Sequence, residues 1–268
     1  MRIIKIPVNY YQQFDADYTL DVPAEGYGGW KKTVLDFDMD RTAVVLMHAT
    51  DYGPREEVEG VYRACQYIPR ANDISENIMP GLLKTIRNGG VKLFHLASNE
   101  QKCLNYAGYE KTRVLPRTNF FQVEQDDAVK RLRQFKYDNG FPGKHNRPGY
   151  DNSAKYGGFP KNEEPLNDEE IFIDEMQLAE YCKREKISHL IYIGYNIDWC
   201  ILFAPGGIFH VSRHGIMCSA IRQAVTACES KETARVNGSR ENSLWQIAVG
   251  FGFVFDLDDF INAIEYAS

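Results

Sequence analysis

Residues 178–200, which read LAEYCKREKISHLIYIGYNIDWC, hold the pattern that decides the fold. Their first part continues a helical spacing of apolar side chains that begins near Glu175 and ends near Lys186. A continuous apolar run over residues 189–194 follows and ends in Gly194. Such a run, apolar on both faces, is typical of a strand buried in a parallel sheet. The order of helix, buried strand, glycine turn and Cys200 predicts one unit of an alternating α/β domain.

The rest of the chain repeats this alternation. Further strands are predicted over residues 42–47, 91–97, 216–221 and 252–255, and helices over residues 74–87, 123–135, 241–249 and from 257 onward. Alternating strands and helices favour a three-layer α/β/α sandwich with a mostly parallel sheet of five or six strands. We assign this domain to residues 42–268, with an irregular N-terminal arm over 1–41. A long inserted loop is expected at about 139–168, where Gly, Pro, Asn and Lys dominate.

Composition excludes several function classes. The net charge of -6 and pI of about 5.6 argue against binding of a nucleic-acid backbone, which requires a basic surface. We expect neither a signal peptide nor a membrane span, because no apolar run is long enough. The six cysteines contain no Cys-x-x-Cys pair, so neither a zinc site nor a disulfide framework is predicted. A cytoplasmic protein with no metal and no cofactor is the simplest interpretation.

The ends of the predicted strands are the expected place for chemistry. Ligands of open parallel sheets bind beyond the carboxyl ends of the strands. Cys200 follows such an end and opens a predicted helix. A thiol there lies near the positive end of the helix dipole, which favours the thiolate and predicts a lowered pKa. The alternative is that Cys200 is a small buried apolar residue, as free cysteines commonly are.

Three stretches resemble one known superfamily. They are NIMPGLLKTIRNGGVKLFHLASN, the 178–200 stretch above, and AIRQAVTAC followed by LWQIAVGFGFVFDLDDFINAI. Together they are similar to the isochorismatase-like cysteine hydrolases, which include nicotinamidases and N-carbamoylsarcosine amidohydrolases. The resemblance runs from about Thr42 to Ile264. It implies that a Cys–Asp–Lys triad attacks a carbonyl and that a cis peptide precedes the nucleophile.

Carried onto this sequence, the resemblance implies that Cys200 is the nucleophile. Tyr195–Asn196 is then the expected cis bond, and backbone N–H groups around Asn196 and Cys200 would hold an oxyanion. Tyr195 and Trp199 flank the cysteine, where they either line a substrate pocket or serve in packing. Asp198 is interpreted as a helix cap.

Two members of the expected triad are displaced. His48 stands where the superfamily has its aspartate, after the strand at 42–47. Either His48 is the base, since a neutral imidazole accepts a thiol proton, or Asp51 takes this part, or the site is degenerate. The superfamily's lysine position falls near Asn167, where no basic residue occurs. Lys155 and Lys161, within the long loop, are the nearest candidates upstream.

The predicted function is hydrolysis of a small amide or other C–N bond through a thioester on Cys200, with a small molecule as substrate. The alternative is a catalytically degenerate binding or scaffold protein. A flavodoxin-like cofactor-binding domain is disfavoured, because the stretch HATDYGPREE lacks a Gly-rich phosphate loop. The resemblance further implies a homo-oligomer, to which the long loop contributes.

Overall fold

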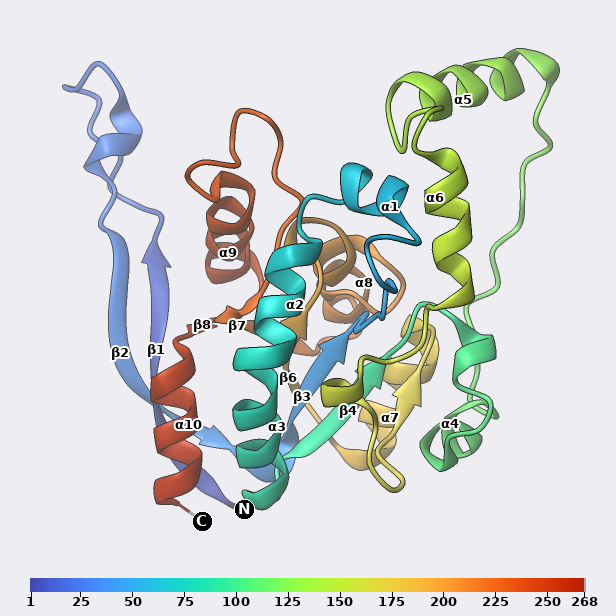
Figure 1. The fold of residues 1–268 in the computed structure, drawn as a ribbon. Helices are drawn as coiled ribbons and strands as arrows, with labels where there is room; N and C mark the ends of the chain where they lie inside the picture. The colour runs from blue at the N-terminus through green and yellow to red at the C-terminus, as the bar shows by residue number, and fades with distance from the viewer. Residues whose placement is uncertain (268) are drawn as a thin grey trace.

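The computed structural model describes residues 1–267 and shows one eight-stranded sheet in the order β2-β1-β8-β7-β6-β3-β4-β5 (Figure 1). The six strands from β8 to β5 are parallel to one another, as predicted for the domain after Thr42. The strands are β1 (Ile3–Gln12), β2 (Gly29–Asp38), β3 (Thr42–Met47), β4 (Lys92–Leu96), β5 (Ile171–Phe172), β6 (His189–Gly194), β7 (Met217–Val225) and β8 (Val254–Phe255).

The two central strands come from the longest apolar runs. Every residue of β3 and of β6 is buried. Their register pairs Thr42 with His189 and Met47 with Gly194, so both strands end at the same level. Continuous burial on both faces fits their place in the middle of the six parallel strands. The residues that follow Met47 and Gly194 are therefore brought together at one sheet edge.

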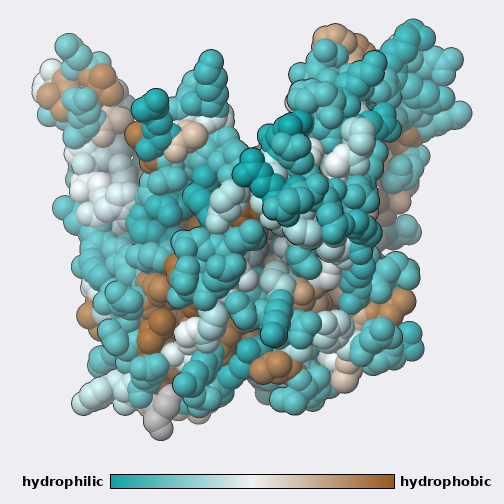
Figure 2. All heavy atoms as spheres, viewed as in Figure 1, coloured by the Kyte–Doolittle hydropathy of each residue, from teal (hydrophilic) through white to brown (hydrophobic). Residues whose placement is uncertain are grey.

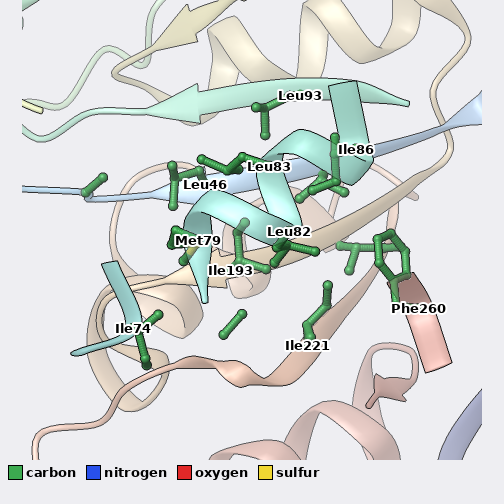
Figure 3. Close-up of a cluster of buried hydrophobic side chains, with 14 of the residues drawn as sticks. Leu46, Ile74, Met79, Leu82, Leu83, Ile86, Leu93, Ile193, Ile221 and Phe260 are labelled. Atoms are coloured by element: carbon green, nitrogen blue, oxygen red, sulfur yellow. The ribbon is translucent and has the colours of Figure 1, made fainter. Parts of the chain in front are cut away.

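Helices cover both faces of the sheet and confirm the three-layer prediction. On one face α2, α3 and α10 share a hydrophobic core with residues of the sheet, and Figure 3 shows Met79, Leu83 and Phe260 within it. On the other face α7, α8 and α9 share a second hydrophobic core with residues of the sheet. The helices are α1 (Glu59–Ala64), α2 (Ile68–Asn77), α3 (Met79–Asn88), α4 (Ala107–Thr112), α5 (Asp127–Asn139), α6 (Arg147–Asn152), α7 (Glu175–Glu185), α8 (Ile208–Ser212), α9 (Gly238–Gly250) and α10 (Leu257–Tyr266).

The prediction of an irregular arm over residues 1–41 is wrong. These residues form the antiparallel hairpin β1–β2, which joins the sheet where Asn9 pairs with Val254 of β8. Ile4, Ile6 and Val8 alternate with less buried neighbours and pack into the core. This period of two is the strand pattern, but Pro7 and the aromatic residues after it obscure it in the sequence.

Two other predicted segments differ in detail. The expected helix over 74–87 is two helices, because Pro80 lies in the first turn of α3 and the chain bends at Ile78. The segment 139–168 contains α6 and short 3-10 turns at Ser153–Lys155 and Lys161–Glu163. No helix within residues 1–267 is both long and apolar enough to cross a bilayer.

Candidate active site

The turn after β6 holds Cys200. Gly194 ends the strand with a φ of 112°, and a side chain there would meet the Met47 carbonyl oxygen at 2.3 Å. Only glycine fits this close approach of β3 and β6. The Tyr195–Asn196 peptide is cis, as the resemblance implied. Ile197–Ile201 then form a single wide turn in which the Ile201 N–H donates to the Asn196 carbonyl at 2.9 Å.

The wide turn changes the electrostatics expected for the nucleophile. Burial raises the pKa of the Cys200 thiol, and the nearby Asp198 carboxylate raises it further, whereas the backbone N–H of Asn196 lowers it. The predicted lowering by a helix dipole is therefore wrong in sign. The turn over Ile197–Ile201 is too short to have a substantial helix dipole. It does not continue into α8, because that helix starts only at Ile208, after Gly207. In the resting protein Cys200 is a protonated thiol at neutral pH.

His48 lies beside this turn. It follows β3 directly, and its backbone N–H donates to the Leu96 carbonyl of β4 at 2.8 Å. The carbonyl of the preceding residue, Met47, accepts the backbone N–H of Tyr195 at 3.1 Å. Its backbone is in the left-handed region, with φ of 53°. Burial lowers the pKa of the imidazole to about 4, so the ring is neutral at pH 7. Within residues 1–267 no hydrogen bond joins this ring to the Cys200 sulfur.

The structure places Asp51 in a different role. Its side chain is exposed, and its carboxylate accepts the Gly53 N–H at 2.8 Å. Its backbone pairs with Gly157 and Gly158 of the long loop, at 2.9 and 2.8 Å. Asp51 therefore stabilises a turn and holds the loop, rather than meeting the thiol.

The two candidate lysines lie at the surface. Lys155 pairs with Glu57 at 2.6 Å, with both side chains about half exposed. Lys161 is exposed at the start of a 3-10 turn. No lysine is among the groups that set the pKa of Cys200. The loop thus brings neither Lys155 nor Lys161 to the sulfur.

The three residues that flank the cysteine have separate environments. Tyr195 is buried, and its hydroxyl donates to Glu163 at 2.6 Å. Asn196 is also buried, and its side-chain oxygen accepts the Thr226 hydroxyl at 2.6 Å. Trp199 is 65% exposed. Tyr195 and Asn196 therefore fix the turn, while Trp199 faces solvent instead of lining a closed pocket.

Asp198 has a larger part than the capping role predicted for it. Its carboxylate accepts the Cys228 N–H at 2.8 Å, which ties the turn to the segment after β7. Burial raises the pKa of Asp198 to about 6. A carboxyl group with this pKa, beside a thiol, changes charge within the range where many enzymes work.

A second group of residues around Cys200 was not predicted. The Tyr52 and Tyr67 hydroxyl oxygens lie 2.8 Å apart. Cys200 interacts electrostatically with Tyr52, Tyr150 and Cys228. Tyr52, Tyr67 and Tyr150 also line a cavity of about 340 Å³, and two of these residues, Tyr52 and Tyr150, interact with Cys200. This volume is at the lower end of the range for small-molecule sites.

The long loop covers this cavity. Tyr150 and Asp151 of α6 line one side, and Val61 and Cys65 from the region of α1 line the other. The two helices meet with backbone against backbone, since a side chain on Gly60 would meet the Asn146 carbonyl oxygen at 2.1 Å. The loop therefore packs closely against α1 and forms a cover over this cavity. In residues 1–267 no cluster of three or more His, Cys, Asp or Glu side chains is arranged to hold a metal ion.

The chain is similar to known proteins in structure but not in sequence. The sequence matches no known protein family and no curated protein. Among solved structures, a cysteine hydrolase from Pseudomonas syringae pv. phaseolicola superposes with a TM-score of 0.50 at 15% identity, covering 87% of this chain and 96% of that one. This chain shares the fold of that cysteine hydrolase. An isochorismatase-like hydrolase from Alkaliphilus metalliredigens is also similar, with a TM-score of 0.47 at 15% identity, covering 85% of this chain and 98% of that one.

A nicotinamidase/pyrazinamidase from Acinetobacter baumanii is a further similar structure, with a TM-score of 0.45 at 11% identity, covering 82% of this chain and 98% of that one. The fold shared with the Pseudomonas cysteine hydrolase confirms the predicted three-layer architecture. At these identities the likeness establishes the fold alone.

Proposed function

We propose that the protein hydrolyses a small amide or related C–N bond, with Cys200 as the nucleophile. The observation that carries this proposal is the turn itself. Cys200 is partly buried at the carboxyl edge of the sheet, and the Asn196 N–H is directed at its sulfur. Tyr52 and Tyr150, which interact electrostatically with Cys200, line a cavity. Nucleophile, N–H donor and cavity are the parts that acyl transfer requires.

His48 is proposed as the base. Its ring is neutral at pH 7 because burial lowers its pKa, and it lies at the strand end next to the nucleophile turn. In this reaction the imidazole takes the thiol proton while the sulfur attacks the carbonyl carbon. Catalytic hydrogen bonds are often long before substrate binds, so the absence of a bond from His48 to Cys200 in the free protein is compatible with this role.

The tetrahedral intermediate then breaks its C–N bond. The His48 imidazolium returns its proton to the leaving nitrogen, which departs as an amine or ammonia, and a thioester remains on Cys200. A water molecule that loses its proton to His48 attacks the thioester, and the acid and free thiol are released. Backbone N–H groups near Asn196 are proposed to hold the oxyanion in both steps.

The cavity suggests the substrate class. Three tyrosines line it, and Asp151 is the one charged residue among its lining groups. Tyrosines combine apolar ring faces with hydroxyl groups that form hydrogen bonds. A small, uncharged, planar amide, ureide or carbamoyl compound would fit these surfaces better than an anion would, since Asp151 repels negative charge.

A screen over amides, ureides and carbamoyl compounds tests the proposal, with release of ammonia or acid as the readout. Wild-type protein and Cys200→Ala are assayed side by side. Turnover that requires Cys200 supports the proposal, whereas turnover that survives Cys200→Ala contradicts it.

A binding or scaffold role is the second candidate. Burial and the Asp198 charge both raise the pKa of Cys200, and Lys155 and Lys161 lie away from it. A protein without turnover that still binds these compounds in the cavity, as measured by calorimetry, would support the binding role.

A further inference from the structure

The helix α5 stands away from the rest of the fold. None of its thirteen residues is buried, and in Figure 1 it lies at the upper right of the molecule, beyond α6. Helices of this length are marginal in water without packing. Even so, α5 exposes three large apolar side chains: Val129 at 38%, Leu132 at 70% and Phe135 at 68%. A helix of this kind is usually covered by a partner.

The apolar residues of α5 share one face, because residues three apart on a helix are neighbours. Basic side chains border this face. Residues 129–136 contain Lys130, Arg131, Arg133 and Lys136, while the two acidic residues of the helix, Asp127 and Asp138, lie near its ends, and Asp127 pairs with Lys130 at 3.3 Å. The surface is therefore an apolar stripe with a positively charged margin, and it fits an apolar partner that carries negative charge.

The tip of the β1–β2 hairpin, residues 13–28, is also apolar but carries the opposite charge. It exposes four apolar side chains, namely Phe14 (55%), Tyr18 (87%), Leu20 (41%) and Val22 (52%). The same sixteen residues contain no basic residue and four acidic ones, namely Asp15, Asp17, Asp21 and Glu25. The tip thus shares the apolar character of the α5 surface and carries the opposite charge.

The base of the hairpin is held firmly. Tyr11 contacts the rings of Trp30 and Trp245, with centroids 5.4 and 6.4 Å away. The Trp245 indole N–H donates to Gln13 at 3.0 Å, so α9 fixes the start of the tip. A projecting segment that is positioned in advance loses less entropy on binding than a flexible one does.

The tip and α5 of one chain are on opposite sides of the molecule. Figure 1 shows the hairpin tip at the upper left and α5 at the upper right, and Figure 2 shows a hollow between the two projections, with apolar residues on both. The two surfaces of a single copy therefore do not reach one another. A second copy brings each surface to its complement.

We propose that the protein forms a two-fold dimer in which the β1–β2 tip of each copy binds the α5 surface of the other. A two-fold axis makes this contact twice, because the pairing of tip to helix is repeated in the reverse direction. Charge complementarity orients the partners, and the apolar residues are covered in the same step.

Sedimentation of the full-length protein across a concentration series tests the proposal. Charge reversal in the tip, Asp15→Lys with Asp21→Lys, places like charges opposite α5. Charge reversal in the helix, Arg131→Glu with Arg133→Glu, does the same from the other side. Each variant alone is expected to weaken the dimer by at least about tenfold. The variant with all four changes is expected to regain most of this loss. Lys231→Glu, at another exposed position, is the control and leaves the dimer unchanged.

A variant that replaces apolar residues of α5 by serine tests the apolar stripe itself. Leu132→Ser with Phe135→Ser removes exposed apolar side chains, so the helix surface loses its contact while the core is untouched. Circular dichroism confirms that each variant is folded. A wild-type protein that is monomeric at every concentration overturns the proposal. A dimer that neither charge reversal weakens also overturns it, because its interface then lies elsewhere.

Discussion

The Tyr195 hydroxyl donates a 2.6 Å hydrogen bond to the buried carboxyl group of Glu163, and this bond joins the turn that holds Cys200 to the long loop. Burial raises the pKa of Glu163, whereas the Tyr195 and Ser75 hydroxyls lower it. The loop therefore does more than cover the cavity. It supplies a side chain that fixes the residue before the cis bond.

Glu163→Gln gives a test of this contact through the pH dependence of stability. In the unfolded chain the carboxyl group loses its proton at its ordinary pKa, while the folded protein retains the proton to higher pH. The free energy of unfolding of the wild type thus falls as pH rises through this window. The glutamine keeps an oxygen that accepts the Tyr195 bond but does not ionise. We expect Glu163→Gln to be more stable than wild type at pH 8 and similar near pH 4, as measured by urea denaturation.

Tyr195→Phe is the companion variant, because it removes the donor and leaves the carboxyl group buried without that hydroxyl. We expect a loss of about 1–3 kcal/mol in the free energy of unfolding. Equal stability of Tyr195→Phe and wild type would show that the bond contributes nothing to holding the loop.

Asp198→Asn is predicted to make Cys200 more reactive toward alkylation. The Asp198 carboxylate raises the pKa of the thiol, and its own pKa is about 6. Above pH 6 wild-type Asp198 is ionised, so removal of its charge lowers the pKa of Cys200 and increases the thiolate fraction. Below pH 6 the wild-type group is already protonated, and the two proteins should react at similar rates.

Iodoacetamide labelling, followed peptide by peptide in a mass spectrometer, measures this effect. Asp258→Asn, at an exposed position on α10, is the matched control and should label as wild type does. A labelling rate for Asp198→Asn that equals wild type at pH 8 would mean that the carboxylate does not act on the sulfur.

His48→Gln is predicted to lower kcat by about 10²–10⁴, the usual contribution of a general base. Because burial lowers the pKa of His48 to about 4, protonation of this residue should not reduce wild-type activity until pH approaches 4. Alkylation of Cys200 at pH 9 needs no base and should be unchanged in His48→Gln. Retention of full kcat by His48→Gln would assign the base elsewhere, with Asp198 as the next residue to test.

Gly60→Ala is predicted to displace the cover. Its new methyl group would meet the Asn146 carbonyl oxygen at 2.1 Å, so α6 must move away from α1. We expect a destabilisation of about 1–3 kcal/mol and faster alkylation of Cys200 by bulky reagents. Gly81→Ala in α3 is the control, since nothing lies within 4 Å of its added methyl group. It should be neutral or stabilise by roughly 0.5–1 kcal/mol. The same loss in both variants would contradict a tight seam between α1 and α6.

The sequence predicts the parts of the fold that have strong local patterns. The buried runs at 42–47 and 189–194 are strands β3 and β6, and the Gly194-to-Cys200 spacing correctly predicts a turn at the end of β6. Strand β5 was missed because it has only two residues, too few for a periodicity to be detected. The hairpin was missed because Pro7 and its aromatic neighbours resemble an irregular segment.

The environment of the site is less predictable, because it comes from segments that are distant in sequence. Tyr52, Tyr150 and Cys228 reach Cys200 from three separate regions, and no local motif connects them. Cys200 is partly buried in the folded chain, which is why its pKa is raised when the local pattern alone indicated the reverse. Asp198 was visible in the sequence, but its bond to Cys228 depends on how β7 is placed beside β6.

Trapping the acyl-enzyme tests the central claim most directly. An active amide from the screen is mixed with the protein, quenched in acid during turnover, digested and analysed by mass spectrometry, with Cys228→Ala assayed in parallel because a second thiol lies nearby. We predict that the acyl group is on the peptide that contains Cys200, in wild type and in Cys228→Ala, and that it is absent from Cys200→Ala. An acyl group on another residue, or turnover by Cys200→Ala, would contradict the assignment of Cys200 as the nucleophile.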